Sequence, residues 1–320
     1  MLGAGAWGTA LAISLSRAHQ ITLWVRDPVQ VELLRAQREN ERYLPGLALP
    51  EAVTISGDFS ATVRAAELAL VAVPLSGFRA TLVSLRQSAP RLPFLWLCKG
   101  LEAGSGLLPH QVAAEEMPDD VPSGALTGPS FAQEVARGLP TALCLAASEA
   151  RFAHRWVHAL SGPRLRLYAN DDVVGAEIGG AVKNVLAIAA GISDGLGLGN
   201  NARAALITRG LAEIARLTEA LGGAAETISG LAGLGDLILT ATGSASRNYR
   251  AGLAFGQGKR PDTEAGVIEG IATAPALLAR ARATGCEMPV TEAVTDLLAG
   301  RITLEASMNR LLRRALRDER

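Results

Sequence analysis

The sequence predicts an α/β protein in which a doubly wound sheet domain is followed by a domain made only of α-helices. Three observations support this fold class. Short apolar runs alternate with amphipathic stretches through the first half of the chain, the strand-like runs then stop, and Ala-, Leu- and Gly-rich helical patterns follow. Strands that alternate with helices indicate parallel βαβ units, whereas continuous helical periodicity indicates a helical domain.

Six apolar runs in the first half are expected to form strands, at residues 21–25, 68–73, 94–98, 125–127, 141–146 and 165–168. The stretches between them place apolar residues at helical spacing, and helices are expected at residues 29–38, 76–87 and 107–116. Later in the chain, helices are expected at residues 172–193, 201–221, 273–283, 290–298 and 304–316. The polar segment 168–172 ends in an aspartate that suits a helix N-cap. We therefore place the first domain at residues 1–169 and the second at 170–320.

Composition excludes several classes of protein. The chain has 320 residues with 31 basic and 31 acidic side chains, so it lacks the positive surplus that binding to nucleic acid needs. Its apolar stretches are interrupted by Gly, Arg or Asp, so no membrane span is expected. The first residues do not have the pattern of a secretory signal. The three cysteines, Cys98, Cys144 and Cys286, are far apart, as expected for reduced thiols of a cytoplasmic protein.

A glycine-rich loop, Gly3-Ala-Gly5-Ala-Trp-Gly8, fits the pattern G-x-G-x-x-G and leads into an apolar helical stretch. In Rossmann-type domains the first glycine makes a tight turn, the second lets a pyrophosphate approach the backbone, and the third allows a helix to pack closely on a strand. The helix N-terminus then provides N–H donors for the phosphates. The run at 21–25 lies at the expected distance for the next strand, so the loop predicts a dinucleotide site.

The end of that next strand bears on which dinucleotide is used. An acid there usually binds the ribose of NAD, whereas an arginine accommodates the 2′-phosphate of NADP. Asp27-Pro28 is a strong helix start, with Asp27 as N-cap, Pro28 at the first helical position and Gln30 two positions later. If Asp27 bonds its own helix, Arg26 is left for the ribose. We therefore predict that NADP(H) is used at least as well as NAD(H).

The loop raises a difficulty, because only Met1 and Leu2 precede it, whereas strands average about five residues. The central strand of the sheet is expected to be nearly absent. A start upstream of Met1 would supply it, and we favour that explanation over a sheet that lacks its central strand.

Lysine is rare in this chain, which contains only Lys99, Lys183 and Lys259 among its 31 basic residues. A lysine that persists where arginine is so common is a candidate for chemistry, because an ammonium can lose its proton and a guanidinium cannot. Lys183 lies in an apolar helix and leans over Gly179 and Gly180, which we expect to leave room for a ligand. A lysine extending from a helix contact toward solvent is the alternative.

Other candidates stand at strand ends and helix starts. Lys99 follows the run 94–98, and Gly128 and Ser130 follow the run 125–127; ligands of such sheets bind at the carboxyl ends of strands. Asp236 lies on a glycine-flanked turn. Ser246-Arg247-Asn248 would suit a phosphate at a helix N-terminus, although simple capping explains it equally well. The histidines show no metal-ligand spacing, so no metal site is predicted, and His154 and His158 are expected on a solvated helix face.

Taken in order, GAGAWGTALA, CKGLE, GPSFA, GGAVKNV, NARAALITRGLAE, AGLGDL, SRN and the glutamate of VIEG resemble the bacterial NAD(P)-dependent glycerol-3-phosphate dehydrogenases. The resemblance implies a Rossmann domain followed by a helical domain. It also implies interconversion of sn-glycerol 3-phosphate and dihydroxyacetone phosphate, which supplies phospholipid synthesis, and it suggests a homodimer.

The resemblance also implies roles for single residues. Lys183 corresponds to the general acid/base. Substrate contacts are implied for Lys99, Gly128, Ser130, Lys183, Asp236, Ser246, Arg247 and Asn248. Cofactor contacts are implied for Gly3, Gly5, Ala6, Trp7, Gly8, Arg26, Lys99, Ala132, Arg247, Val267 and Glu269.

Two alternatives stay open at this point. A dehydrogenase of the β-hydroxyacid type also combines a Rossmann domain, helices and a catalytic lysine, but it usually has its asparagine several residues after that lysine, unlike Lys183-Asn184. A regulatory protein that senses NADP without catalysis would keep the glycine-rich loop and lose the chemistry. The presence of Lys99, Lys183 and Asp236 argues against it.

Overall fold

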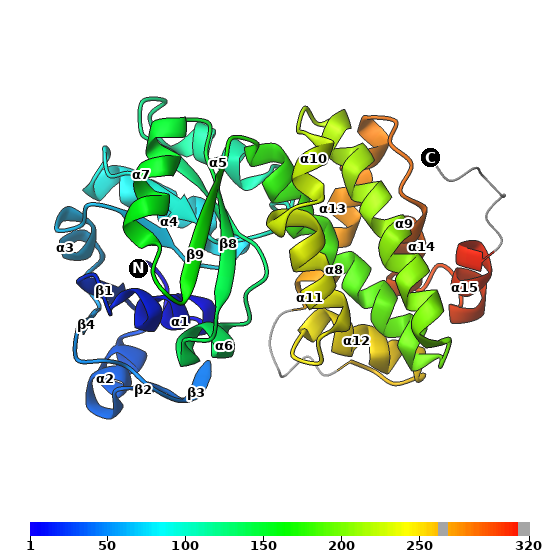
Figure 1. Ribbon diagram of the computed structural model, residues 1–320, viewed down its shortest axis with the longest axis horizontal. Helices are drawn as coiled ribbons and strands as arrows, with labels where there is room; N and C mark the ends of the chain where they lie inside the picture. The colour runs from blue at the N-terminus through cyan, green and yellow to red at the C-terminus, as the bar shows by residue number, and fades with distance from the viewer. Residues whose placement is uncertain (262–267, 313–320) are drawn as a thin grey trace. The chain divides into compact units, whose positions relative to one another are not determined.

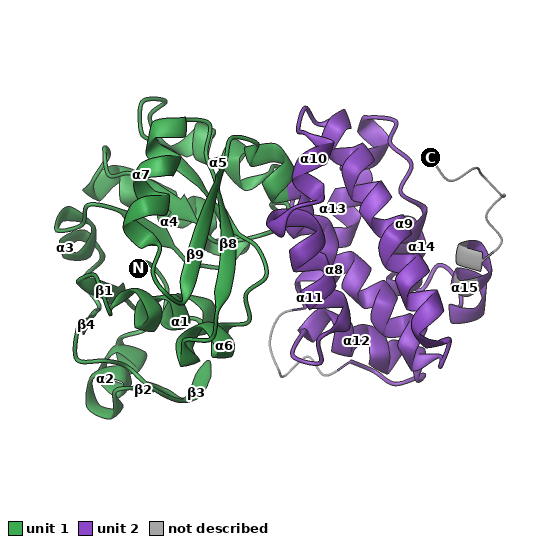
Figure 2. Ribbon diagram, viewed as in Figure 1, with its two compact units in different colours: residues 1–102, 107–177 green, residues 103–106, 178–320 purple. Residues whose placement is uncertain are grey.

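The structure is a computed structural model that describes residues 1–261 and 268–312. Internal contacts divide the chain into two compact units (Figure 2). Unit 1 comprises Met1–Glu102 and Leu107–Glu177, and unit 2 comprises Ala103–Gly106 and the residues from Ile178 onward. The change of unit falls within one long helix, eight residues after the boundary predicted between residues 169 and 170, which stays a prediction.

Unit 1 is the α/β domain that the alternating pattern predicts (Figure 1). Five strands pair in chain order, β5 (Ala69–Val71), β6 (Phe94–Trp96), β7 (Ser123–Thr127), β8 (Thr141–Ala146) and β9 (Leu165–Asn170). A further parallel pair is formed by β1 (Ile21–Trp24) and β4 (Val53–Ser56). All of these pairings are parallel except that of β7 with β8, which is antiparallel and departs from the all-parallel expectation.

Leu2 joins these two groups of strands. It forms parallel bridges to Trp24 of β1 and to Val71 of β5, and its N–H and C=O bond the Leu70 carbonyl and the Ala72 N–H, each at 2.8 Å. The nearly absent central strand is therefore reduced to a bridge around one residue. Since Leu2 is only 1% exposed, this position still fills its place in the core.

The helices of unit 1 pack on the sheet and complete the doubly wound domain. They are α1 (Ala6–Leu15), α2 (Pro28–Gln37), α3 (Phe59–Arg64), α4 (Phe78–Ser88), α5 (Pro109–Glu116), α6 (Ala132–Arg137) and α7 (Ala150–Leu160). A short hairpin of β2 (Glu39–Asn40) and β3 (Leu44–Ala48) follows α2. The hairpin and β4 have too few apolar positions to stand out in the sequence.

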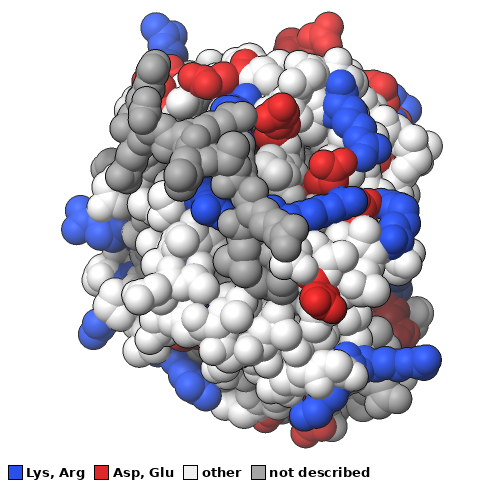
Figure 3. Space-filling view, turned by 90° about the vertical axis from the view of Figure 1, so that its right-hand side faces the viewer, with Lys and Arg blue, Asp and Glu red and all other residues white. Residues whose placement is uncertain are grey.

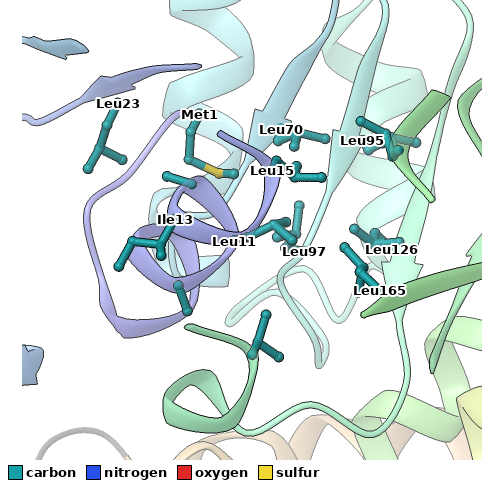
Figure 4. Packing of buried hydrophobic residues seen from close by; sticks show 14 of the residues in the cluster. Met1, Leu11, Ile13, Leu15, Leu23, Leu70, Leu95, Leu97, Leu126 and Leu165 are labelled. Atoms are coloured by element: carbon teal, nitrogen blue, oxygen red, sulfur yellow. The ribbon is translucent and has the colours of Figure 1, made fainter. Parts of the chain in front are cut away.

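The core of unit 1 forms around α1, which is apolar on every side. Figure 4 shows Leu11 and Leu15 of this helix beside Leu97 and Leu70 of the sheet region. Leu11 and Leu95 have no exposed surface, and burying one leucine fully stabilises a fold by about 1.5–3 kcal/mol. The glycine-rich loop is thus anchored by a helix that is held on all its faces.

Unit 2 contains helices and no strand among the residues that the structure describes. They are α8 (Val173–Gly195, whose first residues belong to unit 1), α9 (Gly199–Ala220), α10 (Ala225–Ile228), α11 (Asp236–Thr242), α12 (Arg247–Gly256), α13 (Glu269–Ala283), α14 (Pro289–Leu298) and α15 (Leu304–Leu312). A π-helical turn, Leu231–Gly235, leads into α11. The helical domain predicted from the sequence is therefore confirmed.

The helix α8 is long and apolar enough, by length and composition, to cross a membrane. Such a helix was not predicted from the sequence, because the apolar stretches were expected to be too short. Within the structure, 89% of its most apolar window is buried by the protein itself, as in the core helix of a folded domain. On the face of unit 2 seen in Figure 3, basic and acidic side chains are interspersed.

Candidate functional site

The glycine-rich loop has the geometry that a pyrophosphate site needs. Gly3 has φ +112°, and a Cβ there would lie 2.8 Å from the Ala72 carbonyl oxygen. A Cβ on Gly8 would lie 2.1 Å from the Gly3 carbonyl oxygen, so only glycine lets α1 start this close to the sheet. A Cβ on Gly5, by contrast, would meet no atom within 4 Å. The first amides of α1, which no side chain caps, therefore border open space.

A residue that sequence reasoning missed supports this loop. Asn40 is 1% exposed, and its side-chain amide donates to the Ala4 carbonyl at 2.9 Å and to the Thr9 hydroxyl at 2.8 Å. These bonds tie the loop to the start of α1. Nothing near Asn40 in the sequence suggests this role, because the contact joins residues more than 30 positions apart.

At the end of β1, the structure bears out the predicted helix start. The Asp27 carboxylate accepts the N–H of Val29 at 3.0 Å, and Pro28 is the first residue of α2. Gln30 does not complete a capping box, because its amide donates to Asn40 instead, at 3.4 Å. Asp27 is thus engaged by its own helix, and Arg26 beside it is exposed.

Three predicted substrate contacts come together at the carboxyl ends of β6 and β7. The Gly128 carbonyl lies 3.5 Å from Lys99 Nζ and accepts the Ser130 hydroxyl at 3.0 Å. Gly128 has φ +127°, a conformation that favours glycine. Ala6 and Trp7 start α1, and Ala132 starts α6, which packs against α1. The contacts predicted in unit 1 therefore lie just after β6 and β7 and at the starts of α1 and α6.

In unit 2, Lys183 forms a buried ion pair. Its Nζ lies 2.6 Å from Asp236 Oδ1 and 3.2 Å from the hydroxyl of Thr240. Lys183 is 8% exposed and Asp236 is 1% exposed. Thr240 was not identified from the sequence, although its place one helical turn after Asp236 puts the two side chains on one face of α11.

The expected space beside Lys183 is not there at Gly179, and this part of the interpretation is wrong. A Cβ on Gly179 would lie 2.5 Å from the Ala232 carbonyl oxygen and 3.1 Å from Gly233 Cα. The backbone of the π-helical turn fills the gap that the missing side chain leaves. Because that turn leads directly into Asp236, Gly179 serves to bring the carboxylate close to Lys183.

The asparagine next to Lys183 starts a second network. Asn184 Nδ2 donates to Glu269 Oε2, and Asn248 Nδ2 donates to Asn184 Oδ1, each at 3.0 Å. Asn248 Oδ1 in turn accepts the N–H of Gly270 at 2.9 Å. The starts of α12 and α13 are thereby tied to the middle of α8, next to the ion pair.

The start of α12 supplies donors for an anion. Ser246 is the N-cap, and its hydroxyl accepts the Tyr249 N–H at 3.2 Å. Arg247 is the first helical residue and is exposed. An arginine on the first turn of a helix suits a phosphate, because bidentate N–H donors and the helix dipole act together. Val267, predicted as a cofactor contact, lies outside the described residues.

The cysteines and the two exposed histidines among the described residues were further candidates for reactive side chains. Burial raises the pKa of the Cys144 thiol to about 11, so the thiol is protonated and unreactive at neutral pH. Cys98, Cys144 and Cys286 form no disulfide bond in the structure, and His154 and His158 are exposed as expected. No group of three or more metal-ligating side chains occurs within residues 1–261 and 268–312.

Comparison with known proteins identifies the relatives of this chain. Residues 1–153 match the family model for the N-terminus of NAD-dependent glycerol-3-phosphate dehydrogenase, and residues 172–309 match the model for its C-terminus. Glycerol-3-phosphate dehydrogenase (NAD(P)+) of Acidiphilium cryptum is 64% identical over 322 residues, covering 100% of this chain and 98% of its own. The enzyme of the same name from Aromatoleum aromaticum is 58% identical over 302 residues, covering 93% and 92%.

A solved structure agrees with the sequence relatives. The crystal structure of glycerol-3-phosphate dehydrogenase from Coxiella burnetii superposes with a TM-score of 0.92 at 42% identity, covering 98% of each chain. The likeness thus extends over both units. The chain belongs to the NAD-dependent glycerol-3-phosphate dehydrogenase family.

Proposed function

We propose that this protein is an oxidoreductase that interconverts sn-glycerol 3-phosphate and dihydroxyacetone phosphate with NADP(H) or NAD(H), and thereby supplies glycerol 3-phosphate for phospholipid synthesis. The observation that carries the proposal is the buried Lys183–Asp236 pair, with Nζ and Oδ1 2.6 Å apart. A buried lysine held in one orientation can donate a proton to a carbonyl oxygen as the ammonium and accept a proton from an alcohol as the neutral amine. The activity named for the relatives needs such a group.

The glycine-rich loop fits the pyrophosphate of the dinucleotide, because Gly5 faces open space where the uncapped amides of α1 begin. Bound NADPH supplies the hydride that reduces the ketone. We assign Gly3, Gly5, Ala6, Trp7 and Gly8 to the cofactor, and with them Arg26, Lys99, Ala132, Arg247, Val267 and Glu269. Asn184 bonds Glu269 and therefore holds this carboxylate at the start of α13.

Lys183 moves the proton of the reaction. When dihydroxyacetone phosphate is reduced, its carbonyl oxygen gains a proton from Lys183 Nζ, and the reverse reaction returns it. Asp236 orients the ammonium and balances its charge, and the Thr240 hydroxyl fixes its position from the next turn of α11. Holding the donor in place before the reaction avoids the entropic cost of finding it.

The substrate is recognised by its phosphate. We assign Ser246, Arg247 and Asn248 at the start of α12 to the phosphate, and Lys99, Gly128 and Ser130 to further contacts of the substrate. The bonds between Asn248, Asn184 and Gly270 keep the start of α12 in register with Lys183. This arrangement would align the reacting carbon with the proton donor.

Replacement of Arg247 tests the phosphate assignment. Arg247→Ala is expected to raise KM for dihydroxyacetone phosphate about 10- to 100-fold with a small change in kcat, the range for charge-assisted bonds worth about 1.5–3 kcal/mol. Steady-state kinetics measure this. Arg250→Ala is the matched control, because it removes an exposed guanidinium from the same helix. An unchanged KM in Arg247→Ala would place the phosphate elsewhere.

The cofactor preference provides a separate test. Because Asp27 caps α2 and Arg26 is exposed, kcat/KM with NADPH is expected to equal or exceed that with NADH. Arg26→Ala should lower kcat/KM for NADPH about tenfold, the loss of one charge-assisted contact, and leave NADH unaffected. The measurement with NADH on the same variant is therefore the control for the measurement with NADPH. A clear preference of the unmodified protein for NADH would contradict the assignment of Arg26.

One assay separates this function from the alternatives. NADPH oxidation is followed with dihydroxyacetone phosphate and, in parallel, with a set of keto acids that lack a phosphate. Turnover of the phosphorylated ketone supports the proposal, whereas turnover of the keto acids alone supports a dehydrogenase of the β-hydroxyacid type. NADPH binding without any turnover supports a regulatory protein.

We further propose that the enzyme works in the cytoplasm as a homodimer. Three cysteines that form no disulfide bond support a reducing compartment. Light scattering of the purified protein measures the oligomeric state, and fractionation of cells that express it locates the protein.

A further inference from the structure

A small cavity in unit 1 lies where β6 and β7 end. Its walls include Lys99 after β6, Thr127 at the end of β7, Pro109 at the start of α5 and Glu177 of α8. The cavity has a volume of about 10 Å³. This is about the room that a single water molecule needs, and a water is retained in such a place when two to four polar groups face it.

One wall of the cavity presents a hydroxyl that the protein does not satisfy. Thr127 is 6% exposed, and its Oγ1 has no hydrogen-bond partner among the described residues. A buried hydroxyl normally has a partner, and one that lacks a protein partner commonly bonds an ordered water. Because Thr127 lines the cavity, a water there would supply that bond.

Glu177, another residue that lines the cavity, carries a buried carboxylate. The Glu177 side chain is 3% exposed, and its Oε1 accepts the backbone N–H of His110 at 2.8 Å while its Oε2 bonds His110 Nδ1 at 2.5 Å. Each carboxylate oxygen has two lone pairs, so both can accept a further bond. His110 lies in the first turn of α5, where the helix dipole favours a negative charge.

Lys99 brings a positive charge to the same walls. The charged or titratable groups at this cavity are Lys99 and the Cys98 thiol beside it, Glu177 of α8, and His110 of α5 behind the carboxylate. Attraction between an ammonium and a carboxylate is strong where the surroundings are largely protein. A buried carboxylate with such a neighbour therefore restricts where the ammonium can lie.

We infer that this cavity holds one ordered water and that Glu177 and Thr127, acting through it, are positioning residues for the Lys99 ammonium. This inference rests on the proposed function for the role of Lys99 in binding the phosphorylated substrate. His110 holds Glu177 by two bonds, so its part is to fix the carboxylate that faces the cavity.

Glu177→Gln is the first test, because glutamine keeps an acceptor for the His110 N–H and removes only the charge. We expect kcat/KM for dihydroxyacetone phosphate to fall about tenfold, as when one charge-assisted bond is lost, mainly through KM. Glu213→Gln is the matched control. Glu213 is also buried and accepts the N–H groups of Val290 and Thr291 at the start of α14, but it does not line the cavity. Both variants are expected to lower Tm, and only Glu177→Gln should change the kinetics.

The pH profile supplies a readout that a purely structural role would not move. Burial raises the pKa of Glu177, so the carboxylate becomes protonated at a higher pH than an ordinary glutamate. In the unmodified protein, kcat/KM for the substrate should therefore fall as pH decreases through this pKa, because the charge that orients Lys99 is lost. Glu177→Gln should lack this acid limb, and Glu213→Gln should keep it.

The scarcity of lysine makes a second readout possible that does not depend on activity. Selective ¹³C labelling of lysine gives signals from only Lys99, Lys183 and Lys259, which single Lys→Arg variants assign. The Lys99 signal should move in Glu177→Gln and in Thr127→Val, keep its position in Thr127→Ser, and stay unchanged in Glu213→Gln. A high-resolution crystal structure should show the water bonded to Thr127 Oγ1.

The outcomes are separable. If the unmodified protein does not turn over dihydroxyacetone phosphate, the proposed function fails, and the Lys99 signal still decides the inference. If the protein is active but Glu177→Gln keeps the pH profile, the kinetics and the Lys99 signal of the unmodified protein, the inference is overturned. An empty cavity, with Thr127→Val indistinguishable from the unmodified protein, overturns the part played by water.

Discussion

Lys183→Ala is expected to lower kcat by about 10²- to 10⁴-fold, the usual contribution of a positioned acid or base, while NADPH still binds. The reason lies in the buried pair with Asp236, which holds Lys183 Nζ 2.6 Å from the carboxylate. Stopped-flow or steady-state oxidation of NADPH measures kcat, and quenching of protein fluorescence measures cofactor binding.

The alanine variant also leaves Asp236 buried without its partner, which costs about 3–5 kcal/mol in stability. Lys183→Arg separates this effect from the loss of the proton donor. Arginine keeps a positive charge for Asp236, but it does not release a proton at any pH that proteins tolerate. We expect Lys183→Arg to unfold near the Tm of the unmodified protein and to be nearly as slow as Lys183→Ala.

Lys259→Ala is the control for lysine replacement, because Lys259 is exposed and its Nζ donates to the nearby Gln257 side chain. Its kcat should equal that of the unmodified protein. Near-normal turnover by both Lys183 variants would remove Lys183 from the mechanism, whereas activity retained by Lys183→Arg alone would assign it a purely electrostatic role.

Sequence reasoning identified the features that local pattern determines. The glycine-rich loop, the cap at Asp27 and the long helices of unit 2 each depend on residues within one or two turns of each other. In the structure these features correspond to the positive φ of Gly3, the bond from the Val29 N–H to Asp27 and the length of α8. The family motifs assigned Lys183 and Asp236 to one substrate site, and the structure shows that these residues, 53 positions apart, form an ion pair.

The features that escaped prediction depend on contacts between distant segments. The strand β4 has only two apolar residues, Val53 and Ile55, and it is defined by its pairing with β1. Leu2 forms bridges to both β1 and β5, which approach it from both sides. Nor does any local signal place Glu177 against His110, 67 positions away.

The interpretation of Gly179 shows why a correct observation can still give a wrong conclusion. The glycine does leave a gap next to Lys183, as helix geometry requires. Which atoms enter that gap depends on the π-helical turn at Leu231–Gly235, and only the folded chain shows that its backbone lies there. The same glycine pattern is therefore compatible with a ligand space and with close packing.

Close packing through glycine also governs how α8 holds α12, and it gives the second large effect. A Cβ on Gly252 would lie 2.0 Å from the Ile188 carbonyl oxygen, and a Cβ on Gly191 would lie 2.1 Å from the Tyr249 carbonyl oxygen. Gly195 and Gly256 continue the contact one turn further. A Cβ on either of these residues would lie 2.9 Å from the Cα of the other. The two helices thus touch backbone to backbone.

Gly252→Ala is therefore expected to lower the free energy of unfolding by about 3 kcal/mol or more, the upper part of the range for overpacked cores. Backbone atoms cannot move aside as a side chain can, so the helices must separate. Because a domain is typically stable by only about 5–15 kcal/mol, the loss should be plain in urea unfolding followed by circular dichroism. Gly162→Ala is the control, since a Cβ there meets no atom within 4 Å and the change should stay within about 0.5 kcal/mol.

The same substitution should also impair the site in the molecules that remain folded. The start of α12 carries Arg247 and Asn248, and Asn248 bonds Asn184 of α8 at 3.0 Å. Moving the helices apart stretches this bond, so KM for dihydroxyacetone phosphate should rise in Gly252→Ala even at temperatures well below its Tm. A variant with unchanged unfolding free energy and unchanged KM would show that α8 and α12 do not pack through these glycines.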